Sequence, residues 1–490
     1  MIVEWGPITL LSGTSACATG TSCAGTAAEV TTSIVYGSPG VANNLNPTKI
    51  TAGSGSGDLV VATTATYDVN GDRIAVDGPL VGASDTSTYI YDLARKLVGS
   101  IGPDPDGAGP GLNRAERVTY NARGQAPRIE TGTAAGGVWA NFMPLVKSEA
   151  EYDITAYFRP TITRQMSSAG AISNLQQMTY DAAGRLSCLA VRMNPEQFTS
   201  LPTSACVLDD TGGYGPDRIV RTNYDNAGRA ISSTSGFGTN DALTEAISYT
   251  ANGLVGSLTD GRGHTSILER DGFDRLSKLR YPNSSGGGTS TSDYEQHVYD
   301  QFGRPYSVRN RAGETTYFGY DVLNRLIAVN APDGTPDISS SYDNLDRLTA
   351  SSDGIYTVAN TYDALSRITT EAVTGVGAMS YQYDTASRVT RLVWPDGFYV
   401  TYEYDLYDGL TAAREAGAIS GDEVLARWTW TALGKPASIA RADGAGVATA
   451  YAYDAWGRLS GLTHDAAGAM NDISFGYAYN PAGQVVGRTI

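Results

Sequence analysis

Tyr320-Asp-Val-Leu-Asn-Arg-Leu326 is one copy of a short phrase that recurs along the chain and decides its fold. From Tyr299 to Tyr404 the phrase starts at intervals of 21, 22, 20, 21 and 21 residues. Self-similarity at a fixed period is the signature of a repeat architecture. The clearest copies supply Tyr180, Asp181, Gly184, Arg185; Tyr224, Asp225, Gly228, Arg229; Tyr299, Asp300, Gly303, Arg304; Tyr320, Asp321, Arg325; Tyr342, Asp343, Arg347; Tyr362, Asp363, Arg367; Tyr383, Asp384, Arg388; and Tyr453, Asp454, Gly457, Arg458. Weaker copies start at Tyr67, Tyr91, Tyr120, Tyr249, Arg270, Tyr404 and Tyr479.

The phrase predicts a β-hairpin turn. Tyrosines around it alternate with period two, as in Tyr381-Gln-Tyr383, which is typical of a strand. Its fifth position is often Gly, Asn or Asp, the residues that tolerate a left-handed backbone. A type I turn followed by one left-handed residue is a common three-residue hairpin loop. The Asp and Arg then face each other across the loop as a charge-assisted pair. At Ser366 and Ser387 we expect a strained or altered turn.

One repeat of about 21 residues holds two strands and two turns. We therefore predict an all-β fold, a long and continuous antiparallel sheet of consecutive hairpins. On the order of 16–18 hairpins at about 4.8 Å per strand give a ribbon roughly 150–170 Å long. Such a ribbon does not close a wide shell in one turn, so we expect an open or partly coiled sheet. Its exposed edges invite self-association.

The composition argues against most enzyme and nucleic-acid-binding classes. The 490 residues contain 35 basic and 51 acidic side chains, a formal charge of −16. Binding to phosphates needs clustered Lys and Arg, so no nucleic-acid partner is expected. With three histidines and four cysteines, no metal cluster, nucleophile–base set or cofactor loop is found. We predict no enzyme activity, no catalytic residue, no metal and no cofactor.

Three smaller features each allow more than one interpretation. Cys17/Cys23 and Cys188/Cys206 are two local pairs, compatible with disulfides or free thiols and less so with a metal, since C-x-x-C spacing is absent. Asp68-Val-Asn-Gly-Asp72 has the oxygen spacing of a calcium loop, but Pro79 stands where the glutamate belongs, and a repeat turn explains it as well. The histidines His264, His297 and His464 form no site by spacing.

Targeting signals are not apparent in this segment. The start, Met1-Ile-Val-Glu-Trp-Gly6, lacks the basic and apolar regions of a signal peptide. No stretch approaches 18 apolar residues, so no membrane span is expected.

The repeats resemble those of the RHS or YD-repeat family. Its phrase, roughly G-x-x-T-x-Y-x-Y-D-x-x-G-R-L, is visible in Gly313-Glu-Thr-Thr-Tyr-Phe-Gly-Tyr-Asp-Val-Leu-Asn-Arg-Leu326 and, with slips, over 263–276. The resemblance is strong over 180–490 and weaker over 61–179, and it does not explain the Gly-, Ser-, Thr- and Ala-rich residues 1–60. We predict this three-part division, with 1–60 a cap or degenerate repeats.

The family resemblance implies a function as well as a fold. The family includes bacterial Rhs polymorphic toxins, the C components of insecticidal toxin complexes, and teneurins. Resemblance to it implies a sheet that spirals into a hollow shell. In the bacterial members the shell encloses a C-terminal toxin. No D-P-x-G plug segment lies toward the C-terminal end here, so the chain resembles a piece of wall. The expected partners are a toxin or other polypeptide cargo, or further shell segments, and the expected location is bacterial and secreted or cell-surface.

An alternative hypothesis is an extracellular YD-repeat binding module. Tyr402 and Tyr404, like Tyr451 and Tyr453, are two residues apart and share a sheet face. Stacked tyrosines can bind sugar rings, but cross-strand packing explains them as well. This hypothesis predicts adhesion to carbohydrate, or self-assembly through the sheet edges.

Overall fold

The computed structural model describes residues 9–38, 44–80, 82, 85–107, 111–153, 158–283, 288–332, 334–420, 423–441, 446–466 and 472–490. These residues form 37 strands of one sheet and three short 3-10 helices, η2 (Ala135–Gly137), η3 (Trp139–Asn141) and η4 (Pro195–Gln197). None of the helices among them is long and apolar enough to cross a membrane. The prediction of an all-β fold with one long antiparallel sheet is confirmed.

The chain divides into two compact units. Unit 1 comprises Met1–Lys147, Ser341–Gly476 and Thr489–Ile490, and unit 2 comprises Ser148–Ser340 and Tyr477–Arg488. Strands β10, β24 and β36 cross the division, and β37 of unit 2 ends one residue beyond it, at Thr489.

The strands of unit 1, with the three that cross, are β1 (Gly13–Cys17), β2 (Glu29–Tyr36), β3 (Pro47–Ser54), β4 (Val60–Tyr67), β5 (Arg73–Asp77), β6 (Ser87–Tyr91), β7 (Leu97–Ile101), β8 (Asn113–Thr119), β9 (Arg128–Ala134), β10 (Phe142–Tyr152), β24 (Ile338–Tyr342), β25 (Leu348–Ser352), β26 (Thr357–Tyr362), β27 (Ile368–Val373), β28 (Gly377–Tyr383), β29 (Val389–Val393), β30 (Tyr399–Tyr404), β31 (Leu410–Glu415), β32 (Val424–Trp430), β33 (Pro436–Arg441), β34 (Val447–Tyr453), β35 (Leu459–Asp465) and β36 (Ile473–Tyr479).

The strands of unit 2 are β11 (Pro160–Ser167), β12 (Ile172–Tyr180), β13 (Leu186–Val191), β14 (Arg218–Tyr224), β15 (Ala230–Ser235), β16 (Leu243–Tyr249), β17 (Val255–Thr259), β18 (Thr265–Arg270), β19 (Leu276–Pro282), β20 (Thr289–Tyr299), β21 (Pro305–Arg309), β22 (Thr315–Tyr320), β23 (Leu326–Asn330) and β37 (Val485–Thr489). Strands also occur within residues 1–60, and the three-part division by repeat quality stays a prediction.

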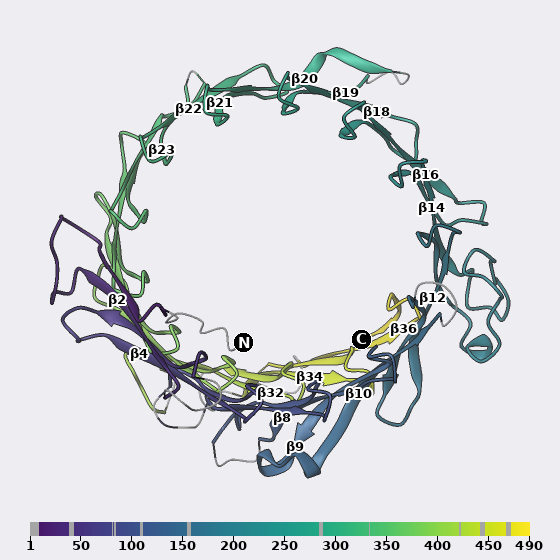
Figure 1. The fold of residues 1–490 in the computed structure, drawn as a ribbon, viewed down its shortest axis with the longest axis horizontal. Coiled ribbons are helices and arrows are strands. Elements are labelled where there is room, and N and C mark those ends of the chain that lie inside the picture. The colour runs from purple at the N-terminus through teal and green to yellow at the C-terminus, as the bar shows by residue number, and fades with distance from the viewer. Residues whose placement is uncertain are drawn as a thin grey trace, which may run out of the picture. The chain divides into compact units, whose positions relative to one another are not determined.

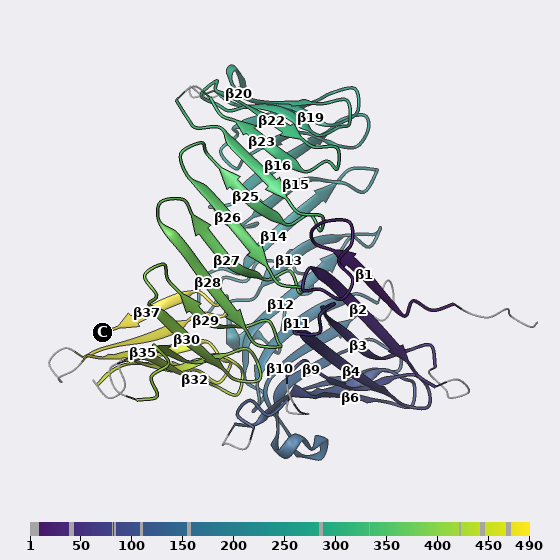
Figure 2. The same ribbon diagram turned by 90° about the vertical axis from the view of Figure 1, so that its left-hand side faces the viewer.

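Consecutive strands pair antiparallel, as expected of hairpins joined end to end. Figure 2 shows β25 to β30 of unit 1 side by side in chain order. In the β26–β27 pair Thr361 faces Thr370, whereas Tyr362 faces Ile368, so one strand carries an extra residue just before the turn. The same register shift accompanies Tyr320, Tyr383 and Tyr453. This bulge is the geometry that a type I turn with one left-handed residue requires.

The turns have the predicted hydrogen bonds and backbone angles. The Asp363 amide donates to the Arg367 carbonyl at 3.0 Å, and the Ser366 amide donates to the Asp363 carbonyl at 3.0 Å. The fifth position is left-handed, with φ 74° at Gly184 and 67° at Asn324. The prediction of this hairpin loop is confirmed.

At the two serine copies a strained or altered turn was expected: the strained backbone is found, and the altered turn is not. Ser366 has φ 62° and Ser387 has φ 67°, and both turns keep the hydrogen bonds of the glycine copies. A left-handed non-glycine residue costs free energy because its Cβ crowds the backbone. Here each hydroxyl lies 3.4 Å from an arginine of the preceding repeat, which helps to hold it in place.

A single sheet buries few side chains. The most enclosed part of unit 2 is where residues 192–217 fold back on the strands. Cys188, Ala190, Ala205 and Ile219 are fully buried there. Cys188 and Cys206 form a disulfide, as do Cys17 and Cys23 in unit 1.

A buried ion pair holds the same segment. The Arg192 Nη1 lies 2.5 Å from Asp217 Oδ2, and the two side chains are 3% and 1% exposed. Gln177 accepts further hydrogen bonds from the guanidinium, and the Met193 amide donates to Asp217. All partners of the two charges are therefore inside the protein.

We predict that Asp217→Ala destabilises this part of unit 2 by about 3–5 kcal/mol, because it leaves a buried guanidinium without its counter-charge. Hydrogen exchange of the amides over 192–217 in urea measures the loss. Asp210→Ala, an exposed position in the same segment, is the control and should change little. Equal protection in the two variants would contradict the prediction.

Candidate functional site: contacts that join the repeats

Each Asp of the repeat phrase organises its own turn. The Asp363 Oδ1 accepts hydrogen bonds from the amides of Leu365 (2.9 Å) and Arg367 (3.0 Å), and its Oδ2 accepts one from Arg367 Nε at 2.7 Å. The same ion pair, at 2.6 to 2.7 Å, joins Asp181–Arg185, Asp225–Arg229, Asp271–Arg275, Asp300–Arg304, Asp321–Arg325, Asp343–Arg347, Asp384–Arg388 and Asp454–Arg458. The carboxylate thus holds both the loop backbone and the arginine.

The arginine held in this way reaches the next repeat. The Arg367 guanidinium lies 4.6 Å from the ring centroid of Tyr383, and its Nη1 donates to the Asp384 carbonyl at 2.8 Å. A cation over an aromatic face is attracted by the ring quadrupole. Equivalent stacking, at 4.3 to 5.0 Å, joins Arg185 to Tyr224, Arg229 to Tyr249, Arg275 to Tyr299, Arg304 to Tyr320, Arg347 to Tyr362 and Arg388 to Tyr404.

The tyrosine reaches back to the repeat before it. The Tyr383 hydroxyl donates to the Ile368 carbonyl at 2.7 Å. The same bond, at 2.7 to 2.9 Å, runs from Tyr180 to Pro160, Tyr224 to Leu186, Tyr249 to Ala230, Tyr299 to Leu276, Tyr362 to Leu348, Tyr404 to Val389 and Tyr453 to Pro436. Successive repeats are therefore joined twice, by an arginine going forward and a tyrosine going back.

Sequence reasoning missed one member of this series. Trp430 takes the tyrosine position, and its indole Nε1–H donates to the Leu410 carbonyl at 2.9 Å. Lys435 replaces the arginine, with Nζ 5.4 Å from the ring centroid of Tyr453. The signal in the sequence is Gly434-Lys435 at the fifth and sixth positions of a phrase that starts with Trp430-Thr431 in place of Tyr-Asp.

Charge and burial shift the pKa of both residue types. The Arg185 amide and then its guanidinium, which donate to Asp181, hold the pKa of that carboxyl below its usual range. The corresponding arginine amides do the same for Asp225 and Asp321. Burial raises the pKa of Tyr383 above its ordinary value.

The other sequence candidates do not come together as a site. Asp68 accepts from the amides of Asn70 and Asp72, as in every repeat turn, and Asp72 is held by Arg95 at 2.8 Å. Within the described part of the chain no three His, Cys, Asp or Glu side chains are grouped to bind a metal.

The three histidines lie apart in sequence and in different hairpins. The Nδ1 of His264 is 3.1 Å from Asp260 Oδ2, and that of His464 is 3.0 Å from Thr449 Oγ1. His297 lies on β20 opposite Val308.

The proposed glycan-stacking tyrosines are partly used in the repeat contacts. The hydroxyls of Tyr404 and Tyr453 donate to main-chain carbonyls at 2.8 Å, and a cation lies over each ring. Tyr402 and Tyr451 are half-buried on the same strands. Sugar binding by these four residues stays a prediction.

Within unit 1, repeat turns from late in the chain sit on loops from early in the chain. Figure 1 shows β8, in blue, next to β32, in yellow-green, and side chains of both strands, Arg114 and Trp430 among them, line one cavity. The Asn344 amide donates to the Ala18 carbonyl at 3.1 Å, and its side-chain amide donates to the Gly20 carbonyl at 2.9 Å. Ala18 and Gly20 belong to the loop that the Cys17–Cys23 disulfide closes.

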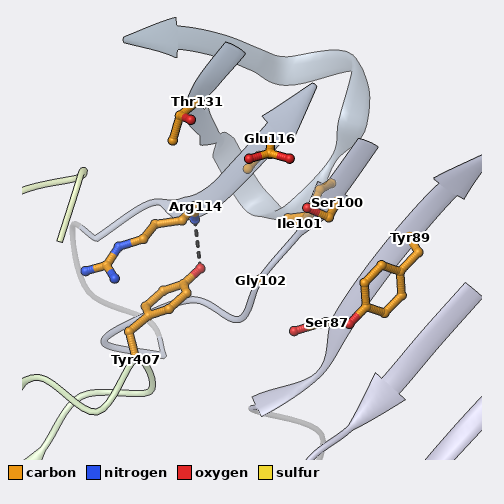
Figure 3. A pocket seen from close by; sticks show the side chains of 10 residues that line it. Ser87, Tyr89, Ser100, Ile101, Gly102, Arg114, Glu116, Thr131 and Tyr407 are labelled. Atoms are coloured by element: carbon orange, nitrogen blue, oxygen red, sulfur yellow. Dashed lines mark hydrogen bonds between the residues drawn. The ribbon is translucent and has the colours of Figure 1, made fainter. Parts of the chain in front are cut away.

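The second contact of this kind borders a cavity of about 280 Å³. The Leu406 amide donates to the Pro105 carbonyl at 3.1 Å, and the Arg114 amide donates to the Tyr407 hydroxyl at 2.8 Å (Figure 3). The Arg114 guanidinium lies 4.0 Å from the Tyr407 ring centroid. A Cβ on Gly102 would come within 2.5 Å of the Tyr407 hydroxyl, so the close approach requires glycine.

Comparison with known proteins identifies the repeat. Residues 430–470 match the sequence profile of the family described as RHS Repeat. This segment is an RHS repeat. This match confirms the resemblance found in the sequence, and it covers Trp430, Lys435 and Tyr453, which make the repeat contacts described above. None of the curated proteins compared with the chain matches it.

Solved toxin-complex structures resemble the RHS-repeat sheet. One is the Tc holotoxin pore of Photorhabdus luminescens with a TccC3 mutation, at 13% identity over 92% of this chain and 24% of that chain, with a TM-score of 0.44. Another is TcdB2–TccC3 without its hypervariable C-terminal region, at 13% identity over 92% of this chain and 30% of that chain, with a TM-score of 0.37. The chain thus spans between a quarter and a third of the length of these solved chains.

We predict that Tyr383→Phe lowers the free energy of unfolding by about 1 kcal/mol, because the Ile368 carbonyl loses its donor while the ring stays in place. Hydrogen exchange of β27 and β28 measures the effect locally. Tyr356→Phe is the matched control, since Tyr356 is 54% exposed and starts no repeat. A loss of the same size in the control would show that the backward hydrogen bond is not responsible.

We also predict that the sheet is destabilised by acid. The pKa values of Asp181, Asp225 and Asp321 are lowered in the folded chain, so the unfolded chain binds more protons as the pH falls. Their contribution is complete above about pH 5 and is lost as the pH falls below about 4, through the folded-state pKa values. Urea unfolding followed by circular dichroism from pH 7 to pH 2 tests this, and a stability that does not fall below pH 4 would contradict it.

Proposed function

We propose that this chain is a non-enzymatic wall segment of an RHS-type shell that encloses or delivers a polypeptide such as a C-terminal toxin. The observation that supports this most is the ribbon of hairpins in which Arg and Tyr residues of most clear copies bond to a neighbouring repeat, as Arg367 and Tyr383 do. Such a ribbon covers area without needing a core on either face. It is therefore suited to forming a wall. Nine equivalent Asp–Arg pairs also argue against an active site, because an active site normally occurs once in a chain.

One face of the sheet has the chemistry that containment requires. The residue before each repeat aromatic is exposed in many copies, and its side chain is often a hydroxyl or an amide. These residues form cross-strand hydrogen bonds, which join Asn223 to Ser232, Ser248 to Ser257, Ser341 to Thr349, Thr361 to Thr370, and Thr429 to Ser438.

A surface of paired hydroxyls offers a partly folded polypeptide hydrogen bonds but little apolar area. It therefore holds a chain without the hydrophobic contact on which aggregation starts. The charge of −16 favours a basic cargo. The two disulfides support an oxidising compartment, and so a secreted or cell-surface protein.

The test is protection of a cargo. An unfolded basic reporter peptide is joined after Ile490, and its cleavage by a protease is timed against the same reporter mixed with the chain but not joined to it. Containment predicts slower cleavage of the joined reporter. Equal cleavage in the two samples would overturn the proposal.

The polar face is tested separately in the joined protein. Thr361→Val together with Thr370→Val removes one hydroxyl pair with little change in shape, and Thr361→Ser with Thr370→Ser is the control that keeps it. We expect the valine variant to aggregate more when the joined reporter is present, as measured by light scattering. The same aggregation in the serine variant would count against a role for the hydroxyls.

A further inference from the structure

In both units, repeat turns contact the other end of earlier hairpins. In unit 1 they meet loops, through the contacts of Asn344 with Ala18 and of Leu406 with Pro105. In unit 2 the turn between β36 and β37 meets the start of a strand, because the Asn174 side chain of β12 donates to the Pro481 carbonyl at 2.8 Å. A turn placed on the far end of an earlier hairpin is therefore a contact that each unit makes with itself.

Three neighbouring turns of unit 2 carry large apolar side chains in solvent. They join β18 to β19, β20 to β21 and β22 to β23, and we call them the unit 2 turn row. Phe273 is 82% exposed, Phe302 70%, Val322 97% and Leu323 62%. An exposed contiguous apolar row on a folded protein marks a contact surface.

Covered and uncovered turns differ in a measurable way. In the turn that Ala18 and Gly20 cover, the side chains of Arg347 and Asp343 are 12% and 4% exposed. In the unit 2 turn row, those of Arg275 and Asp271 are 29% and 24% exposed. In the other two turns of the row the arginine and aspartate are 21% and 19% exposed (Arg304, Asp300) and 21% and 18% exposed (Arg325, Asp321). The repeat ion pair is thus more exposed in the unit 2 turn row than in the turn that Ala18 and Gly20 cover.

The loops of unit 2 have the chemistry that a turn of this kind binds. In unit 1 the tip residue Tyr407 is met by the guanidinium of Arg114, 4.0 Å from its ring centroid. In the loop between β17 and β18, Arg262 is exposed between two glycines. The arginine of its own turn lies over one face of each ring, with Arg275 5.1 Å from the Phe273 centroid and Arg304 5.0 Å from that of Phe302. Since both rings are largely exposed, a further arginine can stack on them, as Arg114 of β8 stacks on Tyr407.

We propose that the unit 2 turn row is a self-association surface, on which a second copy of this chain places the β17–β18 loop edge of its own unit 2. Turn row and loop edge are different surfaces, so the contact is heterologous and adds copies head to tail. This inference does not rest on the proposed containment of cargo, because it concerns the outer ends of the hairpins and not the hydroxyl face.

Sedimentation velocity of the full chain over a range of concentrations tests the proposal. Wild type is expected to form species larger than a dimer as the concentration rises. The variant Phe273→Ser with Phe302→Ser and Val322→Ser should raise the dissociation constant at least about tenfold, or 1.4 kcal/mol. Arg262→Glu, on the opposite surface, should also weaken association.

The matched control replaces three exposed apolar side chains elsewhere, by Ile355→Ser with Val376→Ser and Ile419→Ser, which are 69%, 65% and 82% exposed. It should associate as wild type does. Circular dichroism checks that all variants are folded. A wild type that stays monomeric, or a turn-row variant that associates like the control, overturns the proposal.

Discussion

The arginine of the repeat is the group on which the rest of the structure depends. Its guanidinium is held by the Asp of its own turn, stacks on the next tyrosine, and in copies such as Arg367 donates to the next main chain. A single sheet has water on both faces, so hydrophobic burial alone cannot fix the register of 37 strands. The planar guanidinium fixes the register by making several directed contacts at once. Lysine cannot reproduce them fully because its ammonium group is a point charge.

The contacts between repeats are local, whereas the contacts between turns and loops are not. Asn344 meets Gly20 across 324 residues, and Arg114 meets Tyr407 across 293. They use atoms that every hairpin possesses, namely main-chain amides and carbonyls, together with a few side chains such as that of Tyr407, for which Gly102 leaves room. The same hairpins therefore carry the contacts between turns and loops, the hydroxyl face on which the proposed containment rests, and the exposed turns of the proposed self-association.

Much of the hairpin geometry could be predicted, because each turn is determined by residues within five positions of one another. Asp363 to Arg367 is one such turn, and its hydrogen bonds follow from the residue types. At Ser366 and Ser387 the strain could be predicted, but not that the turn keeps its shape, because each hydroxyl is contacted by the arginine of another repeat. Trp430 was missed because it stands where the other copies have tyrosine. That its indole N–H takes the place of the phenol O–H becomes clear only once the acceptor, the Leu410 carbonyl, is known.

The sequence by itself determined the strands, the turns and the Tyr–Asp–Arg contacts of this protein, since all of them join residues one repeat apart or less. Only the tertiary structure decided which turns are covered. Asp343 and Asp271 stand in the same phrase, yet one is buried under a loop and the other lies in an exposed row. The physical reason is that a periodic sequence gives every repeat the same contacts with its immediate neighbours. Which turn meets which distant loop therefore depends on how the ribbon curves.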